Sequence, residues 1–244
     1  MSQPKRILIV GATSGIGREV ARLYCRAGWR VGIAGRRADR LEALQQEAPE
    51  QIETEQIDVT QADAPLRLEK LIRKTGGMDV FLLSSGIGSQ NLKLDPATEI
   101  ATVQTNAEGF TRMVTAAYHY FCRQGYGQLA VISSIAGTKG LGAAPAYSAT
   151  KRFQNLYIDA LEQLAVMEKH PIIFTDIRPG FVRTDLLRGG RYPMQMKPEQ
   201  VARHIVKAIQ KKKRRVIIDW RYTWLVAAWK CIPAFIWKRL PIHT

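Results

Sequence analysis

The sequence predicts an α/β fold, a three-layer, Rossmann-type, doubly wound parallel sheet of about seven strands in a single domain. Short apolar runs bounded by turn residues alternate along the chain with segments of helical periodicity. Uninterrupted apolar runs are typical of strands that are buried on both faces. The 244 residues, 46% of them apolar and 23% charged, are enough for one large core. We expect the domain to span 1–244 without a linker.

The expected elements follow one another in a regular order. Strands are expected at 6–10, 29–34, 78–83, 128–133, 172–177 and 216–219. Helices are expected at 18–27, 39–47, 64–74, 97–123, 148–169 and 198–212. Doubly wound sheets bind ligands beyond the carboxyl ends of their strands, so the residues after each run are the first candidates for a site.

A glycine-rich turn directly follows the first run. It reads G-A-T-S-G-I-G over 11–17, with glycines at Gly11, Gly15 and Gly17. Glycines allow a tight turn and let the backbone approach a pyrophosphate, which the amides and the helix dipole then bind. The spacing differs from the commoner G-x-G-x-x-G fingerprint. Its place between a strand and a helix favours a dinucleotide loop over an ordinary turn.

Two arginines, Arg36 and Arg37, follow the second run in the sequence A-G-R-R. Enzymes that prefer NAD usually place Asp or Glu there to bind the ribose 2′-hydroxyl, whereas arginines suit the 2′-phosphate of NADP. The nearest acid, Asp39, comes later and is typical of a helix N-cap. In the alternative interpretation, both arginines are solvated charges that open the next helix. We expect NADP(H) to be preferred over NAD(H).

The stretch A-Y-S-A-T-K places Tyr147 and Lys151 one helical turn apart. A free phenol titrates near pH ~10, so it is a poor acid or base at neutral pH unless a neighbouring cation stabilises its anion. The Ser134 hydroxyl could orient a carbonyl by donating a hydrogen bond. Each residue also has an ordinary interpretation: a tyrosine on a helix face, a strand-end cap at Ser134 and a buried amide at Asn106.

These motifs together resemble the short-chain dehydrogenase/reductase family in its compact single-domain form. The resemblance covers nearly the whole chain, and the pieces follow the family's order and spacing. It implies an oxidoreductase that transfers a hydride between NADP(H) and a carbonyl or secondary alcohol. The matching pieces are G-x-x-x-G-x-G at 11–17, D-V at 58–59, N-x-x-G at 106–109, I-S-S-I-A-G at 132–137, Y-x-x-x-K at 147–151 and P-G at 179–180.

The resemblance also implies roles for individual residues. Ser134 would bind the substrate oxygen, Tyr147 would act as acid and base, and Lys151 would hold the nicotinamide ribose and favour the tyrosinate. Asn106 would keep a helix bent and hold a water in a proton relay. Asp58 and Val59 would line the adenine pocket, and Thr184 would contact the nicotinamide end. The implied cofactor contacts are Gly11, Thr13, Ser14, Gly15, Ile16, Gly17, Arg36, Arg37, Asp58, Val59, Ser85, Gly86, Tyr147, Lys151, Pro179, Gly180, Val182 and Thr184.

One loop departs from the family's pattern. Most members have N-N-A-G after the strand expected at 78–83, whereas this chain has S-S-G-I-G at 84–88. We expect the loop still to approach the adenine ribose through Gly86, so the change would alter stability more than binding.

The C-terminal tail, 220–244, combines Trp220, Trp224, Trp229 and Trp237 with aliphatic residues and lysines. Its apolar run is too short to span a bilayer, which takes ~20 residues. The first interpretation is that it packs on the same protein or on a sister subunit and forms a wall of the active site. The second is peripheral contact with a membrane surface, which tryptophan and lysine favour. Either one favours a hydrophobic substrate, over which the segment 184–200 would form a mobile lid.

The net charge of +15 makes polyanions and anionic membranes candidate partners. No DNA or RNA motif accompanies the charge, so we expect no nucleic-acid partner. The resemblance implies a homodimer or homotetramer that forms through the helices carrying N-x-x-G and Y-x-x-x-K.

The cysteines Cys25, Cys122 and Cys231 lack C-x-x-C spacing, and the N-terminal apolar run is short for a signal peptide. We therefore expect reduced thiols, no metal site and a cytoplasmic protein, located at the inner face where it contacts a membrane. The alternative function is a non-catalytic, NADP(H)-binding redox sensor. Sensors of that kind tend to lose the tyrosine or the lysine, and both are present here.

Overall fold

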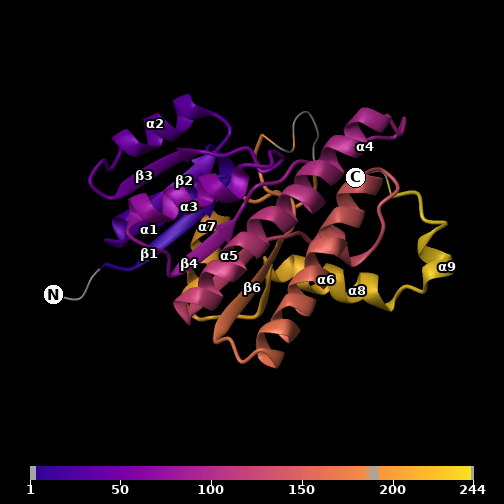
Figure 1. Cartoon of the computed structure of the whole chain (residues 1–244). Coiled ribbons are helices and arrows are strands. Elements are labelled where there is room, and N and C mark those ends of the chain that lie inside the picture. Colours follow the sequence, from indigo (N-terminus) through magenta and orange to yellow (C-terminus); the bar gives the residue numbers. More distant parts are fainter. Residues whose placement is uncertain (1–3, 186, 188–191, 243–244) are drawn as a thin grey trace.

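The computed structural model describes residues 4–185, 187 and 192–242. At the centre of the molecule is a sheet of seven parallel strands in the order β3-β2-β1-β4-β5-β6-β7 (Figure 1). The expected doubly wound α/β fold is confirmed. The strands are β1 (Arg6–Val10), β2 (Arg30–Gly35), β3 (Ile52–Gln56), β4 (Val80–Leu83), β5 (Gly127–Ile132), β6 (Ile172–Pro179) and β7 (Arg215–Ile218).

Helices cover both faces of this sheet, which gives three layers (Figure 1). Side chains of α1, α7 and α8 join the core on one face, and those of α3, α5 and α6 join the core on the other. The helices are α1 (Gly15–Arg26), α2 (Ala38–Gln46), α3 (Ala64–Thr75), α4 (Pro96–Val103), the π-helical η1 (Gln104–Gly109), α5 (Phe110–Gln124), the 3₁₀-helical η2 (Ile135–Thr138), α6 (Pro145–Met167), α7 (Pro198–Gln210), α8 (Trp220–Cys231) and α9 (Ala234–Trp237).

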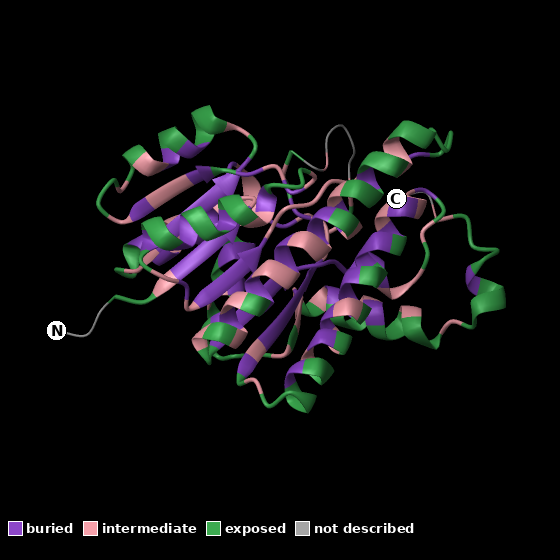
Figure 2. Ribbon diagram, viewed as in Figure 1, coloured by how far each residue is buried: buried purple, intermediate pink, exposed green. Residues whose placement is uncertain are grey.

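Strand β1 illustrates why an uninterrupted apolar run becomes a central strand. Ile7 and Ile9 belong to the core that contains α1, whereas Leu8 and Val10 belong to the core that contains α3. Successive side chains of a strand point to opposite faces, so both alternating sets must be apolar when both faces are covered. These four side chains are fully buried, and the central strands are coloured as buried in Figure 2. Burial of each side chain contributes about 1.5–3 kcal/mol.

The strand β3 is the element that the apolar runs do not predict. Its sequence, I-E-T-E-Q, alternates apolar and polar residues, and it lies at the edge of the sheet beside β2. Glu55 is nevertheless almost buried, because Lys70 and Lys74 of α3 pair with its carboxylate at 3.3 and 2.7 Å. An edge strand covered by long basic side chains does not need the continuous apolar pattern of β1.

Two helix boundaries differ from expectation at places that matter for the site. The helix expected over 97–123 is divided into α4, η1 and α5, and Asn106 lies within the π-helical turn. Such turns often occur at functional sites. The helix expected to begin at residue 18 begins at Gly15, so Gly15 and Gly17 belong to the first turn of α1.

The sheet order reverses between β1 and β4, which are neighbours although β2 and β3 come between them in sequence. At such a reversal the following loops diverge and open a crevice beyond the strand ends, where doubly wound sheets bind ligands. Because all the strands are parallel, the loops after β1, β2, β4, β5 and β6 meet at this edge.

The tail forms helices that its composition does not predict. Tyr222 and Val226 of α8 join the core on the α1 side of the sheet. Within the described residues, no helix has both the length and the apolarity that crossing a bilayer requires. Cys25, Cys122 and Cys231 are free in the structure.

Candidate active site

The loop after β1 is folded so tightly that two of its glycines have no room for a side chain. Gly11 has a φ of +97°, and a Cβ there would lie 2.5 Å from the Ser85 amide nitrogen. A Cβ on Gly17 would lie 2.3 Å from the Gly11 carbonyl oxygen. The bare backbone forms a cradle at the N-terminus of α1, where free amides and the helix dipole suit a pyrophosphate. This shape fits the expected dinucleotide.

Residues beyond β6 reach this cradle from the other side of the crevice. A Cβ on Gly15 would lie 3.0 Å from Thr184 Cγ2, and the Thr184 hydroxyl donates to the Val182 carbonyl at 3.4 Å. Ile16 faces inward and packs against the core. Expected cofactor residues from the loop after β1 and from the segment after β6 therefore lie side by side.

Arg37 is fastened to the same loop. Its Nη2 donates to the hydroxyls of Thr13 and Ser14, each at 2.8 Å, and its Nη1 lies 3.4 Å from Asp185 Oδ2. Arg36 is exposed, and its carbonyl accepts a hydrogen bond from Gln56 Nε2. Arg37 is therefore held at the end of β2 as a cation beside the cradle, with a guanidinium fork of the kind that binds phosphate.

Asp58 and Val59 are held by local packing. The Asp58 carboxylate accepts from the Thr60 amide and hydroxyl at 3.0 and 2.8 Å. Val59 lies against Gly109, where a Cβ would come within 2.7 Å of Val59 Cγ2. The glycine of the N-x-x-G motif thus lets the π-helical turn approach the residues expected at the adenine pocket.

Asn106 ties that turn to the loop after β4. Its Oδ1 accepts from the Ile87 amide at 2.9 Å, and its Nδ2 donates to the Ile87 carbonyl at 2.7 Å. A Cβ on Gly86 would lie 3.3 Å from Asn106 Oδ1 and 3.5 Å from Lys151 Nζ. Gly86 therefore lies at the Lys151 end of the crevice, where the paired hydrogen bonds hold the loop against the π-helical turn.

Tyr147 and Ser134 meet where α6 begins and β5 ends. Burial raises the pKa of the Tyr147 phenol, and a hydrogen bond with the Ser134 hydroxyl opposes this rise. The ring lies against Gly88, where a Cβ would come within 2.2 Å of Tyr147 Cδ2. Gly88, which belongs to the unusual S-S-G-I-G loop, makes the room that the tyrosine ring occupies.

Lys151 lies behind the tyrosine. Its side chain is almost fully buried, and Nζ is 5.7 Å from the centre of the Tyr147 ring. Nζ donates to the Ile132 carbonyl at 3.2 Å and to Gln154 Oε1 at 3.1 Å. Burial lowers the pKa of Lys151 to about 8, and the charge of Asp176 acts in the opposite direction. At neutral pH the site thus contains a buried ammonium.

Several polar residues around Lys151 were not among the predicted site residues. Asp176 is fully buried, and it accepts from Ser133 Oγ at 2.5 Å and pairs with Arg178 at 2.5 Å. Asn155 Nδ2 donates to Ser133 Oγ at 2.9 Å. A charged residue inside the apolar run I-I-F-T-D-I was the available signal for Asp176. For Gln154, the signal was a polar residue three positions after Lys151, on the same helical face.

The segment after β6 is anchored to the tail. A Cβ on Gly180 would lie 2.3 Å from the Tyr222 ring, and the Tyr222 hydroxyl accepts from the Phe181 amide at 3.2 Å. Val182 bridges to Met196. Residues 186 and 188–191 of the expected lid lie outside the described residues. The contact with Tyr222 gives Gly180, next to Pro179, a structural role at the end of β6. Met196, in the second half of the expected lid, is buried.

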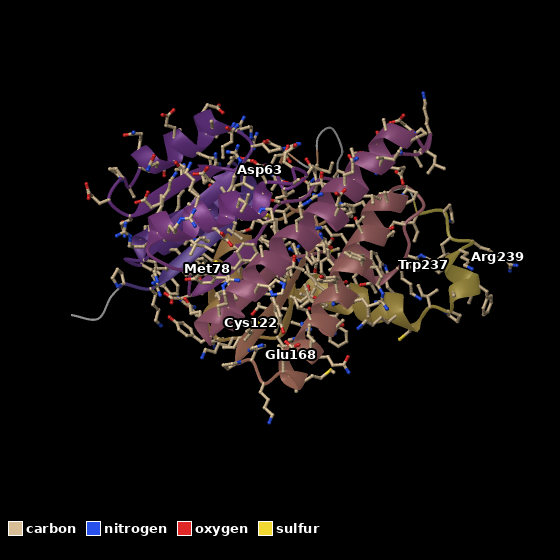
Figure 3. The ribbon with its side chains drawn as sticks, in the orientation of Figure 1. Asp63, Met78, Cys122, Glu168, Trp237 and Arg239 are labelled. Carbon is tan, nitrogen blue, oxygen red and sulfur yellow. The ribbon has the colours of Figure 1, made fainter. Side chains whose placement is uncertain are left out.

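The tail also packs on the segment that follows Ser134. Trp237 of α9, which is labelled in Figure 3, donates from Nε1 to the Gly140 carbonyl at 2.7 Å. Lys139 Nζ donates to the Ile232 carbonyl at 2.8 Å. This agrees with the interpretation in which the tail packs on its own protein. The tail thus places Trp237, which packs on Trp229, beside the loop after η2.

Taken together, the crevice contains a hydroxyl, a phenol and an ammonium on adjoining elements. An oxygen placed against Ser134 and Tyr147 would be oriented by the hydroxyl and could exchange a proton with the phenol. The glycine cradle follows β1 at the same edge of the sheet.

Comparison with known proteins agrees with this geometry. The family model described as short chain dehydrogenase matches residues 5–193. An uncharacterized oxidoreductase of Myxococcus xanthus is 35% identical over 193 residues, covering 77% of this chain and 76% of the relative. The dehydrogenase/reductase SDR family member 7B of Bos taurus is 30% identical over 241 residues, covering 87% and 72%.

Solved structures share the fold. The 3-ketoacyl-(acyl-carrier-protein) reductase of Brucella melitensis, complexed with NADH, superposes with a TM-score of 0.79 at 22% identity over 88% of this chain and 96% of that chain. An actinorhodin polyketide ketoreductase with NADPH has a TM-score of 0.77 at 23% identity over 89% and 97%.

The buried ammonium predicts a specific pH dependence of stability. Below pH 8, Lys151 is charged in both states, and its burial disfavours the native state. Between pH 8 and 10.5 the native protein releases the proton while the unfolded chain keeps it, so wild-type stability rises with pH. Lys151→Met cannot titrate, so its stability relative to wild type should fall by about 3 kcal/mol from pH 7 to pH 10.5.

Urea denaturation at the two pH values measures this difference, in which the titrations of groups that do not interact with Lys151 cancel. The exposed Lys93→Met provides the control and should show no such change. A Lys151→Met difference that stays constant with pH would mean that the lysine titrates normally in the folded protein.

Proposed function

The chain belongs to the short-chain dehydrogenase family of oxidoreductases, and on this premise we propose that it interconverts a carbonyl and a secondary alcohol with NADP(H). The observation that carries the proposal is the convergence of Ser134, Tyr147 and Lys151 beside a glycine cradle. The reaction is a reduction in which the carbonyl carbon gains a hydride and its oxygen gains a proton, or the reverse.

The bound reduced nicotinamide supplies the hydride. The protein's own residues control the oxygen, on which negative charge develops. Ser134 orients it through its hydroxyl, and Tyr147 donates the phenol proton to it. Lys151 stabilises the resulting tyrosinate by opposite charge, which offsets the burial that raises the pKa of Tyr147. Asn106 holds the loop after β4 against α6 and so keeps Gly86 and Gly88 in place.

NADP(H) is proposed as the preferred cofactor because of Arg37. Its guanidinium is anchored to Thr13 and Ser14 at the end of β2, where a ribose 2′-phosphate would lie. Arg36, exposed next to it, adds a second positive charge. The two solved neighbours contain NADPH in one case and NADH in the other, so the preference rests on these residues.

A hydrophobic substrate is part of the proposal and is supported by the aromatic tail beside the loop after η2. The alternative is a redox sensor that binds NADP(H) without turnover. The intact set of Ser134, Tyr147 and Lys151 argues against it, because a sensor needs neither a proton donor nor a tuned cation.

Removing the phenol should abolish turnover but not cofactor binding. Tyr147→Phe is expected to lower NADPH oxidation by roughly 10²- to 10⁴-fold, since it removes the general acid. The measurement is NADPH consumption with a panel of ketones, aldehydes, quinones, steroids and acyl compounds. Tyr157→Phe, on the same helix, is the matched control and should keep full activity. Equal turnover by Tyr147→Phe and wild type would refute the mechanism.

Replacing the anchored arginine should weaken NADPH selectively. Arg37→Leu is expected to raise the Kd of NADPH by about 10- to 100-fold, because a charge-assisted contact with the 2′-phosphate is lost. NADH has no 2′-phosphate, so its Kd should change little. Fluorescence titration measures both constants, with Arg30→Leu at the opposite end of β2 as the control. A wild-type preference for NADH would contradict the proposal.

Two exposed apolar surfaces support proposals about partners. Leu156 on α6 is 64% exposed, and we propose that copies of the chain associate through this helix. Trp220 and Trp224 on α8 are 71% and 72% exposed. We propose that this pair contacts the surface of an anionic membrane from the cytoplasmic side, helped by the net charge of +15.

One pair of variants tests both surfaces, and each variant serves as the control for the other. Leu156→Asp should lower the oligomer mass in sedimentation velocity without affecting vesicle binding. Trp220→Ser combined with Trp224→Ser should lower co-sedimentation with phosphatidylserine vesicles at least ~10-fold without affecting the oligomer. Deleting the whole tail would be uninformative, because Tyr222 and Trp237 are buried. Unchanged vesicle binding by the tryptophan variant would exclude the membrane contact.

A further inference from the structure

Gln154 is a buried amide that no role assigned above uses. It lies on α6, three residues after Lys151, and only 1% of its surface is exposed. Its Nε2 donates to the main-chain carbonyl of Asn106 at 2.8 Å, and its Oε1 accepts from Lys151 Nζ at 3.1 Å. A single side chain therefore spans from the ammonium to the π-helical turn.

The partners of this amide determine which way it points. The Asn106 carbonyl can only accept a hydrogen bond, and the Lys151 ammonium can only donate. Reversing the amide would place donor against donor and acceptor against acceptor in a buried site, which is strongly unfavourable. The oxygen of Gln154 must therefore face Lys151.

A second contact makes the link between the two helices rigid. Asn106 Nδ2 lies 3.3 Å from the hydroxyl of Thr150, which belongs to the same turn of α6 as Lys151. The π-helical turn and α6 are thus joined on both sides of the lysine. Movement of the turn would be transmitted directly to Lys151.

We propose that Gln154 is a positioning residue that holds the Lys151 ammonium against Tyr147 by bridging it to the main chain at Asn106. This inference rests on the proposed function. A neutral amide does not exchange protons at neutral pH, so the bridge orients the ammonium and stabilises its charge without conducting a proton. The reaction then depends on an amide outside the Y-x-x-x-K motif.

Gln154 is one of the neutral groups that accept a hydrogen bond from the Lys151 ammonium. The other groups that face the ammonium come from α6, β6, β5, η1 and the loop after β4. Tyr147 faces it from α6 itself, and Asp176 acts on it from β6, where its charge is paired with Arg178. From β5 the Ile132 carbonyl accepts its hydrogen bond. Asn106 on η1 and Gly86 after β4 contribute no titratable group. Without the Gln154 oxygen, the ammonium would lose one of the two hydrogen-bond acceptors that it has among the described residues, and it would lose its proton at lower pH.

The test compares Gln154→Leu, which has no acceptor, with Gln154→Glu, which keeps one and adds negative charge. In wild type, the reductive kcat/KM should fall above about pH 8, where Lys151 loses its charge. In Gln154→Leu the pH at which kcat/KM begins to fall, here called the pH limb, should move down by about one pH unit. Activity at pH 8 should then fall roughly 5-fold, with little change at pH 6, whereas Gln154→Glu should restore the pH at which activity falls or move it upward.

The matched control is Gln128→Leu. Gln128 is also a buried amide, and it donates to Thr175 Oγ1 and the Ile209 carbonyl at 3.0 and 3.1 Å, away from Lys151. Its replacement should lower the melting temperature without moving the pH limb. A purely structural Gln154 would behave in the same way, and an unmoved limb in both Gln154 variants would overturn the proposal.

A readout without turnover separates this inference from the proposed function. NADPH affinity, measured by fluorescence at pH 6 and pH 8, should weaken with pH more steeply in Gln154→Leu than in wild type, because Lys151 holds the ribose. If wild type oxidises no NADPH with any substrate of the panel, the proposed function fails, and the positioning role is decided by this binding measurement alone.

Discussion

The buried ammonium of Lys151 is the charge to which the rest of the site is adjusted. Taking a cation out of water is costly unless hydrogen bonds and opposite charge compensate for it. Here the compensation comes from Ile132 of β5, Gln154 of α6 and the more distant charge of Asp176 on β6. Because these elements are far apart in sequence, the site forms only when the sheet and α6 are assembled.

Further polar residues hold Asp176 in position. Asp176 is fully buried, and its carboxylate is shared among Ser133, Arg178 and Asn155. Ser133 directly precedes Ser134 in the sequence. The hydrogen-bond network of Asp176, which acts on the charge of Lys151, therefore also positions the end of β5 that carries Ser134. Electrostatics and geometry are therefore coupled, since a change that disturbs Asp176 would affect both the ammonium and the serine.

Local patterns were sufficient to predict most of the fold. A strand such as β1, buried on both faces, must be apolar throughout, and a backbone cradle such as 11–17 must contain glycine. The apolar pattern did not predict the edge strand β3, because its polar Glu55 is covered by lysines of α3. The place of Gly86 and the partners of Gln154 depend on a π-helical turn and on contacts between distant elements, which spacing along the chain does not encode.

The tail extends this dependence to the substrate end of the crevice. Trp237 and Lys139 fasten it to the segment after Ser134, while Tyr222 fastens it to the segment after β6 through Phe181. The Tyr222 hydroxyl also points at the carbonyls of Pro193 and Met194, each 3.1 Å away. The strand ends proposed to hold the cofactor are shaped by glycines and by the sheet. The loops proposed to meet a substrate are fastened by the tail, whereas Ser134, Tyr147 and Lys151 lie after β5 and on α6, so different elements set the two parts of the proposed site.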